Sequence, residues 1–244
     1  MWRADGGQSL IVKDLISVVI PAYNGESYIK ETVESIQHQK IHHEIIVIDD
    51  ISTDRTVEIA RSLGCRIIVN SVHKGQVAGK NTGIHASCGE YWLTIDQDDK
   101  LTDGALQRLY DEMQKYPDNR IIMAQLKDFC SPDVPEQARY VTPRPFYGIL
   151  TGSTLFKKEV FDIIGDFRED IITGEVIDLT YRLEKAGIKI AKVDFVACDR
   201  RIHNKNYGIT NSNDEYKDYA KILREHMRYM HPRHVQKQHL KDCS

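Results

Sequence analysis

Apolar and polar positions along the first hundred residues follow two alternating patterns. Short runs of β-branched and other apolar residues predict buried strands, and apolar residues spaced three or four positions apart predict helices with one buried face. The expected strands are residues 16–20, 44–48, 66–70 and 91–95, and the expected helices are residues 26–38, 52–63 and 76–87. This β-α-β-α-β-α-β order predicts an α/β fold with a mostly parallel sheet and helices on its faces.

The pattern is less regular after residue 117, where proline and polar residues become frequent. Residues 131–147 are expected to form a loop or edge structure. The expected strands are residues 121–125, 151–156 and 188–195, and the expected helices are residues 158–163, 175–186 (capped by Gly187) and 213–230. The length of 244 residues suits one such domain with a small appendage.

The overall charge and the cysteines exclude several classes of protein. A formal net charge of −3 means that nucleic acid is not an expected partner. The five cysteines are odd in number and scattered, with no Cys-x-x-Cys pair, which indicates thiols in a reducing cytoplasm rather than a zinc or redox motif. The N-terminus lacks the pattern of a signal peptide, and no apolar run approaches the roughly 20 residues of a membrane helix.

Polar residues follow the first two expected strands, at the edge where open parallel sheets bind their ligands. Pro21 stops the first strand, and Tyr23 follows it. The tyrosine could stack on a planar base or could simply be an aromatic residue of the turn. After the second strand, Asp49 or Asp50 could accept a hydrogen bond from a base or a ribose, while the other could cap the next helix.

The loop before the third expected helix carries a lysine near the same edge. Residues 73–81 place only three residues between the two glycines and an asparagine after Lys80, so they do not match the phosphate loop of ATPases and kinases. Lys80 could still meet a phosphate as a point charge. A solvated surface lysine is the alternative interpretation.

The strongest signal is the acidic motif Asp96-Gln97-Asp98-Asp99, directly after the fourth expected strand. Three carboxylates so close together repel one another unless a cation or hydrogen-bond donors offset their charge. Carboxylate oxygens are the ligands that Mg²⁺ and Mn²⁺ prefer, and Mg²⁺ commonly bridges such carboxylates to phosphates. The alternative is a solvated turn that caps the helix beginning near Gly104.

Together these motifs resemble the family 2 glycosyltransferases, which have the GT-A fold. The resemblance covers roughly residues 15–211 and rests on the order and spacing of the motifs rather than on any one of them. The matching segments are SVVIPAYN (17–24), IIVIDDISTD (45–54), KNTG (80–83), DQDD (96–99), GEVIDLTYRLEKAG (174–187) and RIH (201–203).

The resemblance implies an enzyme that moves a sugar, with inversion, from a nucleotide-diphosphate donor such as a UDP-sugar to a hydroxyl group of a glycan or lipid-linked sugar. It also implies a Mn²⁺ or Mg²⁺ cofactor and divides the domain into a nucleotide-binding half (15–100) and an acceptor-binding half (101–211). By position in the motifs, Pro21, Tyr23 and Asp50 would hold the base and ribose, Lys80 and Asp96 would lie beside the donor, Asp98 would contact ribose or metal, and Asp99 and His203 would bind the metal.

One departure from the family pattern concerns the base that activates the acceptor. The usual Glu-Asp pair reads Glu175-Val176 here, and valine cannot take a proton. Glu175 or Asp178, both on the first turn of the expected helix, could serve instead, whereas residues 169–170 would need a shifted loop. The structural alternative is favourable charge at a helix N-terminus, worth only ~0.3–1 kcal/mol.

The two ends of the chain lie outside the expected domain. Residues 1–14 are expected to be an extension, and residues 212–244 a helix and basic tail whose spread-out charges favour a solvated end over peripheral docking on anionic lipid. A non-catalytic sugar-nucleotide binding module is the alternative function motivated by Val176. Nucleotidyl transfer is a further alternative, although the segment after Tyr23 lacks the Gly- and Arg-rich loop that holds a triphosphate.

Overall fold

The computed structural model describes residues 10–132, 141–142, 144–171, 174–203 and 221–225. Its strands are β1 Val12–Ala22, β2 His43–Asp49, β3 Arg66–Val69, β4 Gly89–Thr94, β5 Lys100–Leu101, β6 Ile121–Cys130, β7 Phe146–Tyr147, β8 Thr154–Lys157 and β9 Ile190–Ile202. Its helices are α1 Ile29–Gln37, α2 Thr56–Ser62, α3 Gly75–Ala86, α4 Ala105–Lys115, α5 Glu159–Ile164 and α6 Glu175–Lys185.

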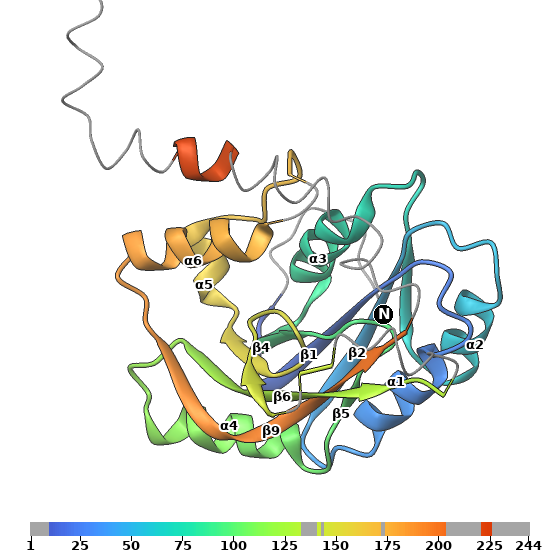
Figure 1. The fold of residues 1–244 in the computed structure, drawn as a ribbon, viewed down its shortest axis with the longest axis horizontal. Coiled ribbons are helices and arrows are strands. Elements are labelled where there is room, and N and C mark those ends of the chain that lie inside the picture. Colours follow the sequence, from blue (N-terminus) through green and yellow to red (C-terminus); the bar gives the residue numbers. More distant parts are fainter. Residues whose placement is uncertain (1–9, 133–140, 143, 172–173, 204–220, 226–244) are drawn as a thin grey trace, which may run out of the picture.

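The strands form one nine-stranded mixed sheet in the order β3-β2-β1-β4-β8-β6-β9-β5, with β7 paired to β6 (Figure 1). Strands β1, β2, β3 and β4 are parallel to one another, and β6 is parallel to β9. Strand β8 joins these two parallel groups by antiparallel pairing with both β4 and β6. The predicted α/β fold with a mostly parallel sheet is therefore confirmed.

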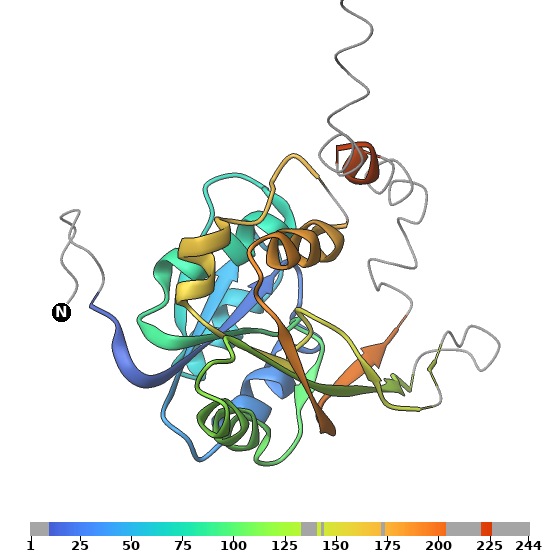
Figure 2. The ribbon, with the colours of Figure 1, turned by 90° about the vertical axis from the view of Figure 1, so that its left-hand side faces the viewer.

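Helices cover both faces of the sheet, as Figures 1 and 2 show. Successive residues of β1 face opposite cores, since Val18 and Ile20 belong to one core and Val19 belongs to the other. The first core also receives apolar residues of α1, α2 and α4. The second receives residues of α3, α5 and α6. This three-layer arrangement leaves the carboxyl ends of β1, β2 and β4 together at one edge.

Helix α3 lies unusually close to β1 because glycine faces the strand. A β-carbon on Gly83 would lie 2.2 Å from a methyl carbon of Val19, and one on Gly79 would lie 3.2 Å from the β-carbon of Pro21. Real atoms do not approach to the first of these distances, so only glycine fits at residue 83. The close packing fixes the position of Lys80, which lies between these two glycines.

Several expected boundaries were wrong. The last strand was expected to end at residue 195, but β9 continues to Ile202 because it pairs with β6 along its length. The short strand β5 was not expected. Residues 221–225 are helical, and the rest of the helix expected at 213–230 lies outside the described residues, as does most of the basic tail. The division into domain halves stays a prediction.

Two further features bear on the sequence-based expectations. Cys65, Cys88, Cys130 and Cys198 are free thiols. Within the described ranges, no helix combines the length and the apolar character needed to cross a bilayer.

Candidate active site

Three carboxylates of the acidic motif converge just beyond the end of β4. One oxygen from each of Asp96, Asp98 and Asp99 lies within 4.8 Å of the others. Asp99 is only 2% exposed, and its Oδ1 accepts a hydrogen bond of 2.8 Å from the backbone N–H of Arg201. Its Oδ2 is buried and has no hydrogen-bond partner among the described residues. A buried carboxylate oxygen without a hydrogen-bond donor costs free energy unless a bound ligand contacts it.

Electrostatics in this motif favour an added positive charge. Burial, together with the charges of Asp98 and Glu175, raises the pKa of Asp96 to about 6 against the opposing effect of Lys80. Burial and the charges of Asp96 and Asp98 raise the pKa of Asp99 well above its usual value. A divalent cation among the three carboxylates would remove this repulsion and satisfy the buried oxygen, so these residues fit Mn²⁺ or Mg²⁺.

The capping alternative for the acidic motif is wrong. Helix α4 begins at Ala105, and its N-cap residue Gly104 makes no side-chain capping hydrogen bond. The N–H of Ala105 instead donates to the carbonyl of Thr102. The start of this helix therefore does not depend on the carboxylates of the motif.

His203, the residue directly after β9, reaches the acidic motif. Its Nε2 lies 2.6 Å from Oδ2 of Asp98, and the residue is only 6% exposed. Its ring packs against that of Tyr28, with the ring centroids 4.8 Å apart. The structure thus brings together the histidine and the acidic residues that the sequence placed more than a hundred positions apart.

Arg201 belongs to the RIH segment of the family resemblance, but the sequence interpretation gave it no role. Its guanidinium donates to the carbonyl of Asp98 at 3.0 Å and to Oε2 of Glu31 at 2.7 Å. It also lies over the rings of Tyr28 and Phe129, at 4.9 and 4.6 Å from their centroids. This buried cation fixes the backbone of the acidic motif against α1 and β6. The strand pattern gave no sign of it because the end of β9 is too polar to be recognised.

Asp50 is held as a charged acceptor beyond the end of β2. It accepts hydrogen bonds from the side chain of Asn70 at 2.8 Å and from the backbone N–H of Gly75 at 2.7 Å. Burial alone would raise its pKa, but the donors from Asn70, Lys74 and Gly75 together lower it. Nδ1 of His73 lies 2.8 Å from the same carboxylate. Asp50 therefore stays ionised and faces a partly exposed imidazole.

Tyr23 lies next to His73, the imidazole that contacts Asp50. Its side chain is 47% exposed, and its ring centroid is 4.7 Å from that of His73. An exposed ring can receive a planar ligand, so the base-stacking interpretation stays a prediction. Pro21 is a buried support of this segment, paired in register with Ile48 of β2.

The other carboxylates near Asp50 serve the turn. Oδ2 of Asp49 accepts a hydrogen bond from the N–H of Ser52, and Oδ1 of Asp54 accepts one from the N–H of Thr56 at the start of α2. The first residue of α2 thus finds a carboxylate acceptor without Asp50. Both oxygens of Asp50 already accept hydrogen bonds, whereas Oδ1 of Asp49 is buried and has no hydrogen-bond partner among the described residues. The role of Asp50 toward a ligand stays a prediction.

Lys80 is not a surface residue, so that alternative was wrong. Its side chain is 3% exposed, and its Nζ lies 2.9 Å from Oε1 of Glu175. Both residues act electrostatically on Asp96. The ion pair therefore brings the first turn of α6 next to the acidic motif.

Asp178 is engaged elsewhere. Its carboxylate lies 2.8 Å from Nε of Arg182 and 3.8 Å from a guanidinium nitrogen of Arg168, and the residue is 4% exposed. Glu169 accepts a hydrogen bond from Asn81. Of the two carboxylates expected to serve as a base, only Glu175 lies among the groups that influence the acidic motif. The valine that replaces the usual aspartate, at position 176, is 37% exposed.

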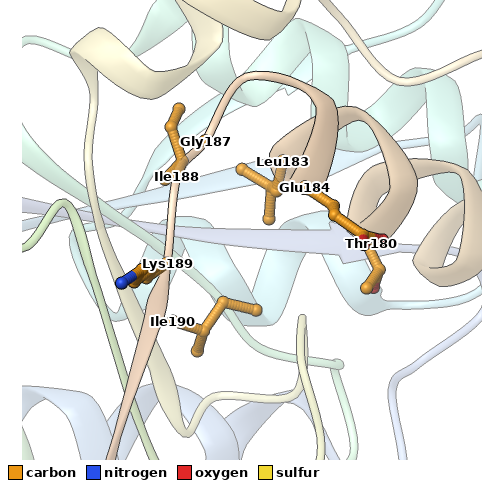
Figure 3. A pocket seen from close by; sticks show the side chains of 7 residues that line it. All are labelled: Thr180, Leu183, Glu184, Gly187, Ile188, Lys189 and Ile190. Atoms are coloured by element: carbon orange, nitrogen blue, oxygen red, sulfur yellow. The ribbon is translucent and has the colours of Figure 1, made fainter.

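A separate hollow of about 380 Å³ lies beside the turn from α6 to β9 (Figure 3). It adjoins the first residues of β9, whereas Arg201 and His203 lie at the other end of that strand. It therefore does not belong to the acidic site. Its lining consists of Thr180, Leu183, Glu184, Gly187, Ile188, Lys189 and Ile190.

Comparison with known proteins decides the family. The model of glycosyl transferase family 2 matches residues 17–168, well over half of the chain. The chain belongs to glycosyltransferase family 2. The match includes the segments around Tyr23, Asp50 and Lys80 and the acidic motif. Glu175, Arg201 and His203 of this family 2 chain lie beyond the matched residues.

Two bacterial glycosyltransferases are among the proteins whose sequences are similar to this family 2 chain. Glycosyltransferase GlyG of Streptococcus pneumoniae is 36% identical over 110 residues, which is 43% of this chain and 36% of the relative. GalNAc(5)-diNAcBac-PP-undecaprenol beta-1,3-glucosyltransferase of Campylobacter jejuni is 35% identical over 107 residues, 41% of this chain and 34% of the relative. The matched segment thus spans about a third of these relatives' lengths.

Solved structures agree on the fold. S. aureus TarS 1-349 in complex with UDP-GlcNAc superposes with a TM-score of 0.67 at 19% identity, over 85% of this chain and 65% of the other. Mannosyltransferase PcManGT of Pyrobaculum calidifontis, in complex with GDP-Man and Mn²⁺, superposes with a TM-score of 0.66 at 18% identity, over 87% of this chain and 64% of the other. The family 2 chain therefore has the GT-A fold predicted from its motifs.

Proposed function

We propose that this protein is an inverting, metal-dependent glycosyltransferase that moves a sugar from a nucleoside-diphosphate donor, UDP-sugar in the first instance, to a hydroxyl group. The observation that carries the proposal is the buried Oδ2 of Asp99, which lacks a donor among the described residues and lies within a cluster of three carboxylates. Family membership, and the nucleotide-sugar complexes of the two structural neighbours, favour sugar transfer over nucleotidyl transfer.

In the proposed donor complex, the base and ribose lie against Tyr23 and Asp50. Asp96, Asp98, Asp99 and His203 would hold Mn²⁺ or Mg²⁺. That cation would supply Lewis-acid stabilisation of the negative charge on the departing diphosphate. Arg201 keeps the backbone of the acidic motif in place through its hydrogen bond to Asp98.

The proposed reaction is a single displacement. The acceptor oxygen forms a bond to the anomeric carbon while the bond from that carbon to the diphosphate oxygen breaks, and the nucleoside diphosphate leaves with the electron pair. The acceptor proton passes to a carboxylate on the opposite side of the sugar. Glu175 is the proposed base, since Asp178 is already paired with two arginines. Attack opposite to the leaving group inverts the anomeric centre.

A second candidate is a module that binds a nucleotide sugar without transferring it. Val176 favours this candidate, because the position at which the family pattern has an aspartate carries an exposed valine. Glu175, the remaining carboxylate, already accepts a hydrogen bond from the ammonium group of Lys80. This contact competes with the acceptor hydroxyl for one of the two carboxylate oxygens.

Calorimetry and turnover separate the two candidates. We expect UDP to bind to the full chain with Mn²⁺ and more weakly after chelation, and GDP serves as the comparison ligand. Hydrolysis or transfer from a panel of UDP-sugars then reports catalysis. Metal-dependent UDP binding without any turnover supports the binding module. Absence of binding to both nucleotides, with and without Mn²⁺, contradicts both candidates.

The acceptor is proposed as a hydroxyl group of a glycan or a lipid-linked sugar. The name of the Campylobacter relative describes an undecaprenol-linked acceptor, which motivates this proposal. A place in the cytoplasm, with peripheral contact to a membrane, would suit such an acceptor. In the described part of the basic tail, however, Lys221 pairs with Asp170 at 2.8 Å. Co-sedimentation with anionic vesicles, compared between the full chain and Lys221→Ala, tests the membrane contact.

A further inference from the structure

Gln97 is the member of the acidic motif that carries no charge, and its amide joins the motif to the Tyr23 segment. The backbone N–H of Tyr23 donates to Oε1 of Gln97 at 3.0 Å. Nε2 of Gln97 donates to the backbone carbonyl of Tyr23, also at 3.0 Å. These two residues are 74 positions apart in the sequence. One side chain therefore satisfies both backbone groups of the residue that lies at the proposed base site.

The surroundings of Gln97 are shaped for this contact. A β-carbon on Gly25 would lie 2.1 Å from Oε1 of Gln97, so only glycine leaves room for the amide there. The buried hydroxyl of Thr32, on α1, donates to the carbonyl of Gln97 at 2.7 Å. The residue is thus fixed through its backbone as well as through its side chain.

The contact continues the pairing of the two strands past their ends. Strands β1 and β4 are paired in register up to Val19 and Thr94, and the N–H of Ile95 donates to the carbonyl of Val19. Beyond that point the Gln97 amide offers one acceptor and one donor, as a backbone peptide group would. The Gln97 amide therefore joins the Tyr23 segment directly to the acidic motif.

We propose that Gln97 is a positioning residue that couples binding of the nucleotide base at Tyr23 to binding of the divalent cation at Asp96, Asp98 and Asp99. Each ligand binds the arrangement in which both hydrogen bonds are made better than one in which they are broken, and so favours the geometry that the other ligand needs. The coupling is reciprocal, since each ligand must raise the affinity for the other by the same factor. This inference rests on the proposed function, because it needs both ligands to bind.

Uridine is the probe that isolates the coupling. A cation contacts the diphosphate of UDP directly, which couples the two ligands without help from the protein. Uridine has no phosphate, so any effect of Mn²⁺ on its affinity passes through the protein. We expect Mn²⁺ to tighten uridine binding to the wild-type chain by a factor of about 5 or more, the lower end of typical coupling between sites.

Three variants test the role of the amide. Gln97→Met keeps the length of the side chain and removes both hydrogen bonds, so the Mn²⁺ effect on uridine should fall to within about 2-fold of unity. Gln97→Glu keeps the acceptor for the Tyr23 N–H and loses the donor, and should retain an intermediate effect. The matched control is Gln107→Met on α4, an exposed glutamine whose amide donates to Asp111, which should behave as wild type.

The outcomes distinguish this inference from the proposed function. Wild-type coupling of uridine and Mn²⁺ that is lost in Gln97→Met, with an unchanged Tm, supports the role of Gln97. If Mn²⁺ changes the uridine affinity of Gln97→Met by the same factor as that of the wild type, the inference is overturned and the proposed function stands. The same holds if Mn²⁺ leaves the uridine affinity of the wild type unchanged while the wild type still binds UDP with Mn²⁺. If the wild type binds neither UDP nor uridine, the proposed function fails and the coupling fails with it.

Discussion

The ammonium group of Lys80 lies 2.9 Å from the carboxylate of Glu175, although 95 residues separate the two in the sequence. The lysine side chain is 3% exposed and that of the glutamate is 16% exposed. This pair joins α3, in the nucleotide half proposed from the sequence, to α6, in the proposed acceptor half. Its burial makes the loss of one partner more costly than the loss of a surface pair.

Replacement of Lys80 by methionine should destabilise the protein by about 3–5 kcal/mol, because Glu175 is left largely buried without its cation. Chemical denaturation followed by circular dichroism measures this change. The control is Lys30→Met, which removes a surface pair with Glu34 whose side chains are 65% and 41% exposed, and should cost ~1 kcal/mol or less. The double variant Lys80→Met/Glu175→Met should be more stable than Lys80→Met. An equal loss in the free energy of unfolding for Lys80→Met and Lys30→Met would contradict a buried ion pair.

Asp99→Asn should separate the metal role of Asp99 from its structural role. The amide keeps an oxygen for the Arg201 N–H but removes a charge whose ionisation burial and neighbouring carboxylates oppose. Stability in metal-free buffer at neutral pH should therefore rise or stay unchanged, while the increase in Tm that Mn²⁺ gives the wild type is lost. Turnover should fall by more than the roughly 10–100-fold that is typical when a residue hydrogen-bonded to a metal ligand is replaced.

Thermal melts with and without Mn²⁺ measure the first effect of Asp99→Asn, and kinetics with a UDP-sugar measure the second. The exposed Asp118→Asn serves as the control for both. A normal Mn²⁺ shift in Asp99→Asn would refute the assignment of Asp99 as a ligand.

The two candidate bases should differ in how far their replacement lowers turnover, because Glu175→Gln also breaks the buried pair with Lys80 and so loses stability as Asp178→Asn does. Glu175→Gln should lower kcat by about 10²–10⁴-fold with little change in KM, the usual contribution of a general base. Asp178→Asn should mainly lower stability, because it weakens contacts to Arg168 and Arg182. Steady-state kinetics beside melting curves measure both.

Val176→Asp provides the complementary gain-of-function test. It places a carboxylate at the position that carries the base in the family pattern, and should raise turnover if that position suits the acceptor better than Glu175 does. If Glu175→Gln keeps full activity, Glu175 is not the base. If the wild type is inactive and Val176→Asp is active, the binding module is the natural state of this chain.

Acid should weaken the attachment of the segment at residues 221–225. Hydrogen bonds from Arg168 and Lys221 lower the pKa of Asp170, so its contribution to stability is present above about pH 4, the ordinary value for aspartate, and is lost as the pH falls further. The side chain is 55% exposed, which limits this contribution to ~1 kcal/mol or less. Chemical denaturation at pH 6 and pH 3 should show that the free energy of unfolding falls less between these two pH values for Asp170→Asn than for the wild type. An equal loss in both would contradict this assignment.

The first half of the fold could be predicted because its signals are local. Apolar runs indicated the first four strands, and the rule that ligands bind at the carboxyl ends of parallel strands placed Tyr23, Asp50 and Asp99 at one edge. The end of β9 was missed because it contains charged residues whose burial depends on pairing with β5 and β6. The hydrogen bonds of Gln97 and the ion pair of Lys80 were not predictable, since each joins residues that only the assembled sheet brings together.

The bond from the Arg201 N–H to Asp99 spans 102 residues, and this separation affects how the protein is made. At the usual ~5–20 residues per second, a ribosome needs about 5–20 s to add that length of chain after Asp99. During that interval the nascent chain carries three crowded carboxylates without the strand that organises them. A translation pause or truncation before β9 would therefore yield chains that have every residue matched by the family model but an unfinished cation site.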